Sequence, residues 1–315
     1  VVRITHTTIC GTDLHILKGD VPAVTAGRIL GHEGLGVVEE VGDGVSNIKV
    51  GDEVLISCVT SCGRCDYCKR GVYSHCRDGG WILGHLIDGT QAEYVRIPHA
   101  DNSLYLLPEE MDRAAAVMLS DILPTGHEIG ALNGEVKLGD TVAIVGAGPI
   151  GLAALMTSRF YSPARIIMID PDENRLAMAK MLGATDTIAR DPIEAIKKLT
   201  DGEGVDVAME AVGIPETFDI CQSIVRSGGH IANIGVHGKS VEFKLQDLWI
   251  KNITLRTGLV NTNTIPVLMR VVESGGVKPA DLVTHRFKLD DIEKAYDIFS
   301  EAAKEQAIKM LLTAE

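Results

Sequence analysis

The stretch Thr141–Gly151, which reads Thr-Val-Ala-Ile-Val-Gly-Ala-Gly-Pro-Ile-Gly, decides the fold of the second half of the chain. Its first part, Thr141–Val145, is a short apolar run of the kind that forms a buried strand. Three glycines follow, and a proline among them marks the start of a helix that we expect over 149–160. The stretch therefore predicts a strand, a glycine turn and a helix in direct succession.

The same rhythm continues on the C-terminal side of this stretch. Apolar runs alternate with helical patterns, which predicts strands over 164–170, 205–210 and 230–236 and helices over 173–182, 193–199 and 215–226. Near-continuous apolar strands that alternate with helices are typical of a parallel sheet covered on both faces. We therefore expect an α/β domain with a doubly wound parallel sheet over 124–265.

The first part of the chain has a different texture. Residues 1–123 hold many glycines and short β-like runs, including 1–9, 34–41, 53–57 and 93–97. This spacing predicts a compact β-rich module. After 265 a helix (265–274), a strand (283–287) and an amphipathic helix (289–301) are expected to pack back on that module. A chain of 315 residues suits two domains.

The glycine turn has the spacing and the context of a dinucleotide-binding loop. Gly146 permits the tight turn, Gly148 lets the backbone approach a pyrophosphate, and Gly151 allows helix and strand to pack closely. The loop residues Pro149 and Ile150 open the helix, whose N-terminus favours the negative charge of phosphates. These residues are our candidate cofactor loop.

An acidic residue, Asp170, stands nineteen residues past Gly151 at the end of the second predicted strand. A carboxylate at this position accepts hydrogen bonds from the adenosine ribose and repels a 2′-phosphate, which favours NAD over NADP. The alternative role for Asp170 is a turn residue before Pro171. Arg175 is also a candidate cofactor contact, and an arginine there can serve a 2′-phosphate.

Four cysteines lie within the lobe 58–80, at positions suited to one tetrahedral ion: Cys62, Cys65, Cys68 and Cys76. Zinc bound by four thiolates fills its own coordination shell, so the site is structural and carries a net negative charge. Nearby cations offset that charge: Arg64, Lys69, Arg70 and Arg77. A disulfide cluster is the alternative, and the absence of a secretory pattern disfavours it.

The composition excludes several classes of partner. A formal net charge of −13 argues against nucleic acid and anionic membrane surfaces. We see no apolar run long enough to span a bilayer. Reduced thiols and metal ligation point to a cytoplasmic setting.

At this point a family resemblance is evident. The matching motifs are Cys-Gly-Thr-Asp-Leu-His (10–15), Gly-His-Glu-Gly-Leu-Gly (31–36), Ser-Asp-Ile-Leu-Pro-Thr-Gly (120–126), the glycine loop and the four-cysteine lobe. The chain resembles zinc-dependent medium-chain alcohol dehydrogenases over nearly its whole length, without the opening strands of the family. The resemblance implies a GroES-like catalytic domain (1–123 and 266–315) and a Rossmann NAD-binding domain (124–265). An unpaired strand edge and an uncovered apolar face are then expected near Val1.

The resemblance implies a second zinc, which is catalytic and is bound by Cys10, His32 and Asp121, so that we expect two zinc ions per chain. One thiolate, one imidazole and one carboxylate neutralise Zn²⁺ and leave a fourth position for substrate. An oxygen ligand in place of sulfur predicts looser zinc binding. Glu33 has two open roles: approach to the metal during substrate exchange, or support of the ligands.

The family's proton path maps onto Thr12 and His15. The resemblance implies that Thr12 takes the proton of the alcohol while a hydride passes to the nicotinamide, and that His15 releases the proton to solvent. The alternative for His15 is an ordinary surface imidazole. Thr125 matches the family's threonine beside the nicotinamide ring.

Trp81 and Leu259 are candidate walls of an apolar substrate pocket, which predicts small aliphatic alcohols and their aldehydes or ketones. Packing of the zinc lobe is an equal alternative for Trp81. Rival functions are a polyol or L-threonine dehydrogenase, a non-catalytic structural relative, and an inactive truncated form. The resemblance implies a homodimer or homotetramer joined through a sheet edge, which we expect near Trp249–Leu259.

Overall fold

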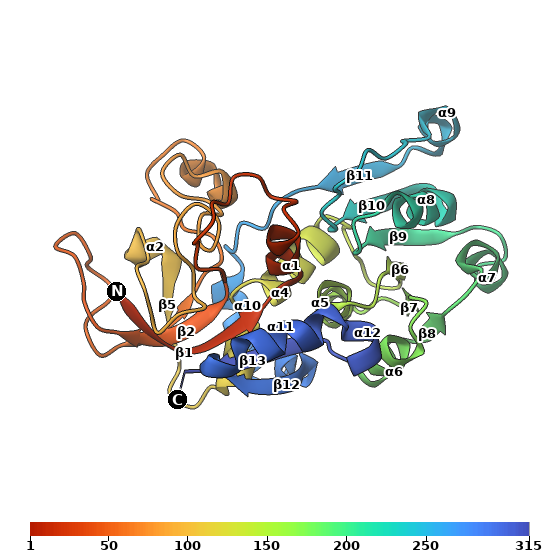
Figure 1. The fold of residues 1–315 in the computed structure, drawn as a ribbon. Helices are drawn as coiled ribbons and strands as arrows, with labels where there is room; N and C mark the ends of the chain where they lie inside the picture. The colour runs from red at the N-terminus through yellow and green to blue at the C-terminus, as the bar shows by residue number, and fades with distance from the viewer. Residues whose placement is uncertain (315) are drawn as a thin grey trace. The chain divides into compact units, whose positions relative to one another are not determined.

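The computed structural model describes residues 1–314, which form two compact units (Figure 1). The first unit holds Val1–Pro124 and the segment from Val260 onward, and the second holds Thr125–Leu259. The chain returns to the first unit earlier than the predicted residue 266. The reason is local, because the side chain of Asn261 accepts hydrogen bonds from the backbone and hydroxyl of Ser74, at 3.1 and 2.8 Å.

The first unit is built on a seven-stranded mixed sheet. Its strands run in the order β12-β13-β1-β2-β3-β5, and β4 pairs with β1. All neighbours are antiparallel except β12 and β13. The strands are β1 (Val2–Ile9), β2 (Gly34–Val38), β3 (Glu53–Ile56), β4 (Tyr94–Val95), β5 (Leu104–Leu106), β12 (Val283–Lys288) and β13 (Lys309–Thr313).

The expected unpaired edge near Val1 is not present. Val2 pairs with Val38 of β2 on one side and with Val95 of β4 on the other. A cavity of about 810 Å³ does lie beside this end of β1, and its lining includes Val1, Val2, Val38 and Ile97. The hydrogen bonds of the strand are therefore satisfied, although the surface next to it is hollowed.

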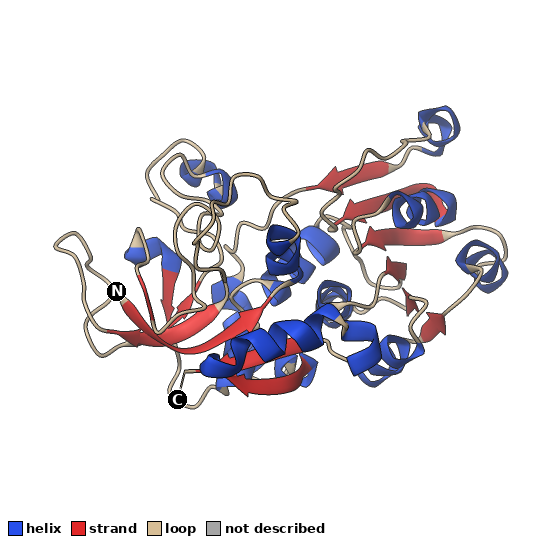
Figure 2. Cartoon of the chain, in the orientation of Figure 1, coloured by secondary structure: helices blue, strands red, loops and turns tan. Residues whose placement is uncertain are grey.

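The helices of the first unit are short. They are α1 (Gly11–Leu17), α2 (Ala100–Ser103), α3 (Arg113–Val117), α4 (Ile122–Thr125, which ends at the first residue of the second unit), α10 (Ile265–Glu273), α11 (Ile292–Ser300) and α12 (Ala302–Glu305), with 3₁₀ turns η1 (Cys68–Arg70), η2 (Tyr73–His75), η6 (Pro279–Leu282) and η7 (Leu289–Asp291). The amphipathic helix expected over 289–301 begins with the turn η7. Figure 2 shows α11 against the sheet, where Ala295 and Phe299 share a buried cluster with Ile9.

The second unit contains a six-stranded sheet in which every neighbouring pair is parallel, in the order β11-β10-β9-β6-β7-β8. The strands are β6 (Thr141–Val145), β7 (Arg165–Ile169), β8 (Asp186–Ile188), β9 (Val205–Glu210), β10 (Val225–Asn233) and β11 (Thr254–Thr257). Successive residues Val142 to Val145 of β6 are all buried. Because successive side chains of a strand point to opposite faces, both faces of the sheet are covered, as predicted.

Helices flank this sheet: η3, a π-helix (Gly126–Leu132), α5 (Pro149–Ser158), η4 (Arg159–Tyr161), α6 (Glu173–Met181), α7 (Pro192–Leu199), α8 (Pro215–Ile224), α9 (Leu245–Leu248) and η5 (Trp249–Lys251). Strand β10 begins earlier than the predicted residue 230, and α8 ends earlier than predicted. The helix does not reach the predicted residue 226, because Val225 already pairs with Val205 of β9.

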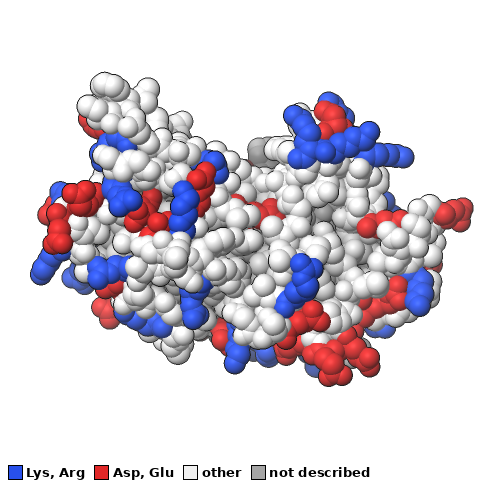
Figure 3. All heavy atoms as spheres, turned by 180° about the vertical axis from the view of Figure 1, so that it is seen from behind, with Lys and Arg blue, Asp and Glu red and all other residues white. Residues whose placement is uncertain are grey.

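On the face in Figure 3, basic and acidic side chains both occur and alternate with large uncharged areas. No helix within residues 1–314 combines the length and the apolar character that crossing a membrane requires.

Candidate functional site

Three potential metal ligands converge in the first unit from three separate segments. Cys10 follows β1 and is the N-cap residue of α1, His32 precedes β2, and Asp121 lies between α3 and α4. The antiparallel pairing of β1 with β2 brings the first two together. One ligand atom of each residue lies within 4.8 Å of the others. His32 Nε2 is 3.3 Å from Asp121 Oδ2.

The electrostatics of this cluster favour a cation. His32 is buried. Burial alone lowers its pKa, but hydrogen bonds with Asp121 and Cys10 raise the pKa well above its ordinary value. Positive charge between these groups is thus stabilised. A sulfur, an imidazole nitrogen and a carboxylate oxygen are the donor types that zinc accepts, and three protein donors leave a position open.

Two further side chains, Asp13 and Cys58, contact these potential ligands. Asp13 Oδ2 accepts a hydrogen bond from the backbone N–H of Cys10 at 2.9 Å, and its Oδ1 faces His32 Nδ1 at 4.0 Å. The thiol of Cys58 lies 3.5 Å from Asp121 Oδ1. Sequence reasoning missed both roles. The signal for Asp13 was available, because an acidic residue three positions after an N-cap residue can reach back to the N-cap backbone.

Glu33, the residue after His32, is held away from solvent by an ion pair. Its Oε2 accepts hydrogen bonds from Lys309 Nζ and from the hydroxyl of Thr8. Both members of the pair are 1% exposed. Burial is the largest single effect and lowers the pKa of Lys309, but the charges of Glu33, Cys10 and Asp121 and the hydrogen bond to Glu33 together raise the pKa above its ordinary value. No sequence signal linked residues 33 and 309.

The candidate proton-path residues both lie on α1. Thr12 Oγ1 is 3.7 Å from the sulfur of Cys10, beside the metal ligands. His15 is exposed, and its Nδ1 is 2.9 Å from Asp20 Oδ2. The structure thus places Thr12 next to the cluster and His15 at the solvent surface.

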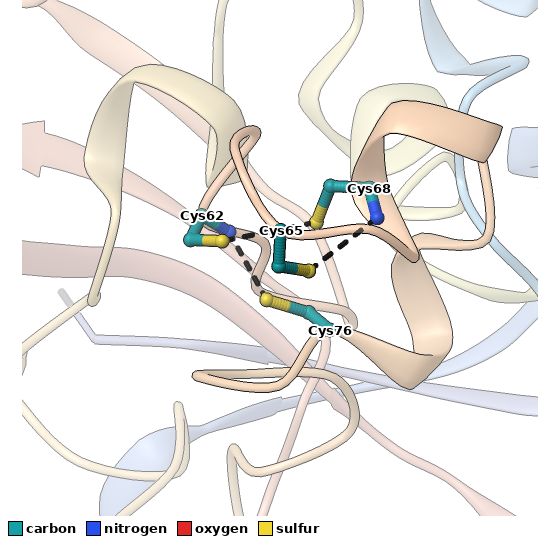
Figure 4. Close-up of side chains that lie close together, drawn as sticks. All are labelled: Cys62, Cys65, Cys68 and Cys76. Carbon is teal, nitrogen blue, oxygen red and sulfur yellow. Dashed lines mark hydrogen bonds between the residues drawn. The ribbon is translucent and has the colours of Figure 1, made fainter.

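The four lobe cysteines converge as well (Figure 4). Their four sulfur atoms lie within 4.8 Å of one another, and the four cysteines are free thiols that form no disulfide. Backbone N–H groups point at the sulfurs: that of Cys62 donates to Cys76 Sγ at 3.2 Å, and that of Cys68 to Cys65 Sγ at 3.5 Å. The N–H of Arg77 lowers the pKa of Cys65 to about 6. The backbone N–H of Arg64 also lowers the pKa of Cys62, whereas burial raises the pKa of Cys68 and of Cys76, so without a metal the thiolate form that binds zinc is favoured at two of the four positions.

Two of the four flanking cations have partners of their own. Arg77 donates from Nε to Asp66 at 2.5 Å, and Arg70 lies 4.0 Å from the same carboxylate. Both guanidinium groups stand over the ring of Tyr67, at 5.0 and 5.2 Å. Arg70 and Arg77 therefore rest on the outside of the lobe, where Asp66 already neutralises part of their charge.

In the second unit the glycine loop has the geometry that a pyrophosphate site requires. Gly146 has φ +105°, which favours glycine. A Cβ on Gly151 would lie 1.8 Å from the carbonyl oxygen of Gly146, so no side chain fits there. A Cβ on Gly148 would meet open space instead. The backbone of the loop therefore packs tightly against its own helix at Gly151. At Gly148 it has free space beside it, where a phosphate would approach. Pro149 and Ile150 begin α5.

Asp170 follows β7 and is buried at 6% exposure. Its Oδ2 accepts a hydrogen bond from Ala147 N of the glycine loop at 2.7 Å, and its Oδ1 accepts one from Asp172 N at 2.9 Å. Arg175 Nε lies 3.9 Å from the carboxylate of Asp172. Asp170 is therefore hydrogen-bonded to the glycine loop, and Arg175 lies near the carboxylate of Asp172.

The remaining candidates are placed as follows. Trp81 is half-buried and stacks on His85, with ring centroids 4.3 Å apart. Leu259, the last residue of the second unit, is 42% exposed. Thr125 ends α4 and is half-buried. The pocket and nicotinamide roles of these three residues stay predictions.

Comparison with known proteins identifies both units. Residues 1–109 match the family "Alcohol dehydrogenase GroES-like domain", and residues 149–274 match "Zinc-binding dehydrogenase". An alcohol dehydrogenase of Cupriavidus necator is 36% identical, over 95% of this chain and 87% of its own. An L-threonine 3-dehydrogenase of Bacillus velezensis is 34% identical, over 94% of this chain and 87% of its own.

Solved structures agree. The zinc dependent alcohol dehydrogenase 2 from Streptococcus pneumonia has a TM-score of 0.95 and 60% identity, over 99% of this chain and 90% of its own. Two more distant solved structures contain a cofactor. A dehydrogenase from Sinorhizobium meliloti, 29% identical, is bound to NADP, and one from Escherichia coli, 28% identical, is bound to NADH. Motifs, fold and relatives agree over both units, so the chain belongs to the zinc-dependent medium-chain alcohol dehydrogenase family.

Proposed function

We propose that this protein is a zinc-dependent alcohol dehydrogenase that transfers hydride reversibly between small aliphatic alcohols and NAD, giving aldehydes or ketones. The observation that carries the proposal is the convergence of Cys10, His32 and Asp121 in a unit whose companion unit holds a dinucleotide loop. A non-catalytic relative would not need this ligand set.

In this proposal Cys10, His32 and Asp121 hold the catalytic zinc, and the four lobe cysteines hold a structural zinc. Zinc at the first site would supply a Lewis acid that lowers the pKa of an alcohol and polarises a carbonyl. Asp13 orients His32 by facing its Nδ1. Glu33 is held back by Lys309, which favours a supporting role over direct ligation.

Thr12 and His15 divide the handling of the proton. The Thr12 hydroxyl, beside Cys10, accepts the proton of the alcohol as it passes its own proton on toward His15, which releases a proton to solvent. Asp20 occupies the Nδ1 side of His15, so Nε2 is the nitrogen that exchanges with water. Thr12→Val should lower kcat far more than it changes KM, whereas His15→Ala should mainly alter the pH profile of kcat.

NAD is the proposed cofactor. Asp170 is hydrogen-bonded to the glycine loop, where we propose that it meets the adenosine ribose, and the carboxylate of Asp172, 3.9 Å from Arg175 Nε, offsets part of the positive charge that a 2′-phosphate would need. We expect kcat/KM to be higher with NAD than with NADP. Asp170→Ala should lower the value for NAD about tenfold, the equivalent of one charged hydrogen bond, and raise that for NADP. A chain that prefers NADP before the substitution would contradict the assignment.

The substrate is proposed from apolar candidates, Trp81 and Leu259. The residues that follow Trp81 in the sequence, Ile82 and Leu83, are apolar, and His85, which stacks on Trp81, is the one polar side chain described in contact with it. Because an L-threonine 3-dehydrogenase is among the similar proteins, L-threonine is the alternative substrate to test. Zinc-loaded protein should reduce NAD with primary or secondary alcohols, followed by absorbance, and should turn over L-threonine and sorbitol poorly. No reduction with any alcohol by protein that holds two zinc ions per chain would overturn the proposal.

We also propose a homodimer or homotetramer joined through β11. This strand ends the six-stranded sheet and has one paired neighbour, β10, among the described strands. Leu255 on β11 and the preceding Trp249 and Ile250 are exposed. Leu255→Lys should reduce the mass measured by sedimentation to that of a smaller species if this edge is the interface.

A further inference from the structure

Three side chains from distant segments form one chain of hydrogen bonds whose last member, Asp13, faces a candidate metal ligand. Tyr296 of α11 donates its hydroxyl to Gln91 Oε1 at 2.7 Å. Gln91 Nε2 donates to Asp13 Oδ2 at 3.0 Å. Asp13 Oδ1 then faces Nδ1 of His32 at 4.0 Å. All four residues belong to the first unit.

The amide of Gln91 has only one orientation that satisfies its neighbours. Its nitrogen donates both to Asp13 Oδ2 and to the backbone oxygen of Thr8, at 3.0 and 3.2 Å. A flipped amide would place its oxygen against these two acceptors. The nitrogen must therefore face them, which leaves Oε1 toward Tyr296 and makes the tyrosine the donor. Tyr296 thus holds the oxygen end of the amide, and the amide holds the carboxylate.

Asp13 depends on these contacts because it is completely buried. Its Oδ2 has two donors, Cys10 N and Gln91 Nε2. Its Oδ1 has no hydrogen-bond partner among the described residues, and His32 Nδ1 is the group that faces it. A carboxylate with one oxygen fixed by two donors can present the other in a single direction. In metal sites such a carboxylate sets the orientation and basicity of the histidine.

We propose that Tyr296 is a positioning residue for His32, acting through Gln91 and Asp13 to fix the histidine in its metal-binding orientation. The inference rests on the proposed zinc site at Cys10, His32 and Asp121. It adds a residue of the C-terminal segment, which touches none of the three ligands in the hydrogen bonds described. Tyr296 is half-buried, so its ring packs in the helix–sheet interface while its hydroxyl serves the network.

The test compares the release of the two zinc ions from full-length protein after addition of a colorimetric chelator. Tyr296→Phe keeps the ring and removes the hydroxyl. Loss of a partner in direct contact with a zinc-ligating histidine costs 10–100-fold in affinity. Tyr296 acts two side chains farther away, so we expect release from the Cys10 site to accelerate by about 3- to 10-fold. Release from the four-cysteine site should not change, which provides an internal control.

Two further variants separate positioning from general loosening. Gln91→Met interrupts the chain, so adding Tyr296→Phe to it should have no further effect on zinc release. Tyr94→Phe removes a hydroxyl from a 54% exposed ring on β4 and should leave both release rates at the wild-type value. Equal rates of zinc release from wild type and Tyr296→Phe, or an equal acceleration of release at both sites, would overturn the positioning role of Tyr296 but not the proposed zinc site. A wild-type chain that binds zinc only at the four cysteines would overturn the proposed function together with it.

Discussion

Lys309 Nζ and Glu33 Oε2 form an ion pair in which each side chain is 1% exposed. Lys309 opens β13, and Glu33 directly precedes β2. The pair therefore joins the C-terminal strand to the segment that carries His32. Removal of one partner from such a pair leaves a buried charge without compensation, which costs far more than the pair itself contributes.

Lys309→Met should destabilise the protein by about 3–5 kcal/mol, since Glu33 would remain charged and buried. Urea denaturation followed by circular dichroism measures this change. The double variant Lys309→Met with Glu33→Gln should recover much of the loss, because no uncompensated charge remains. Lys304→Met, at a position 75% exposed, is the matched control and should change the free energy of unfolding little. A loss below about 1 kcal/mol for Lys309→Met would show that water reaches Glu33.

Two substitutions in the glycine loop distinguish its contribution to the stability of the fold from its proposed contribution to cofactor binding. Gly151→Ala places a Cβ 1.8 Å from the Gly146 carbonyl and should destabilise the protein by about 1–3 kcal/mol. Gly148→Ala meets open space at φ −73° and should leave the melting temperature unchanged. It should nevertheless weaken NAD binding in calorimetry, because the added methyl stands where a pyrophosphate approaches. Unchanged NAD affinity of Gly148→Ala would place the cofactor elsewhere.

In the proposed zinc site, Asp121 is the third ligand, and we expect it to set how firmly the catalytic ion is held. Asp121→Cys exchanges a carboxylate for a softer thiolate of the same charge, so we expect slower zinc loss to a chelator, by about tenfold. Asp121→Ala should lose zinc during dialysis. Zinc content and release rates measure both outcomes. If neither variant alters zinc content or release, Asp121 is not a ligand.

A pH-dependent contact lies at Asp101 of α2. Its carboxylate accepts hydrogen bonds from the backbone N–H groups of Asn47 and Ser46, at 2.8 and 3.0 Å, and from the Ser46 hydroxyl. The Asn47 bond and then the Ser46 hydroxyl lower the pKa of Asp101. The stabilisation is thus complete above the ordinary pKa of an aspartate and is lost as pH falls through the lowered value.

Amide hydrogen exchange tests this contact. Protection factors of residues 46 and 47 should fall in acid, and Asp101→Asn should lower them already at neutral pH. Protection factors that do not respond to acid or to the substitution would show that other contacts hold this loop.

The sequence predicted those parts of the site that short motifs specify. The glycine loop, the four cysteines and the strands and helices of 141–224 other than the three-residue strand β8 follow local rules of spacing and periodicity. Helix α1 was missed because it is only seven residues long and begins at a cysteine. Gln91, Tyr296 and Lys309 were missed because their partners are distant in the chain, and such pairings depend on the three-dimensional path of the sheet.

The pairing of β1 with β13 has a consequence for how the protein acquires its metal. On one side of β1, His6 to Ile9 pair antiparallel with Met310 to Thr313, so the strand that leads into Cys10 is completed by a segment that follows the whole second unit in the sequence. The second unit lies entirely between these segments and has its own core, so it can fold during synthesis. Contacts of such long sequence separation form slowly. At the proposed zinc site, we therefore expect metal capture by Cys10 to follow the folding of the second unit.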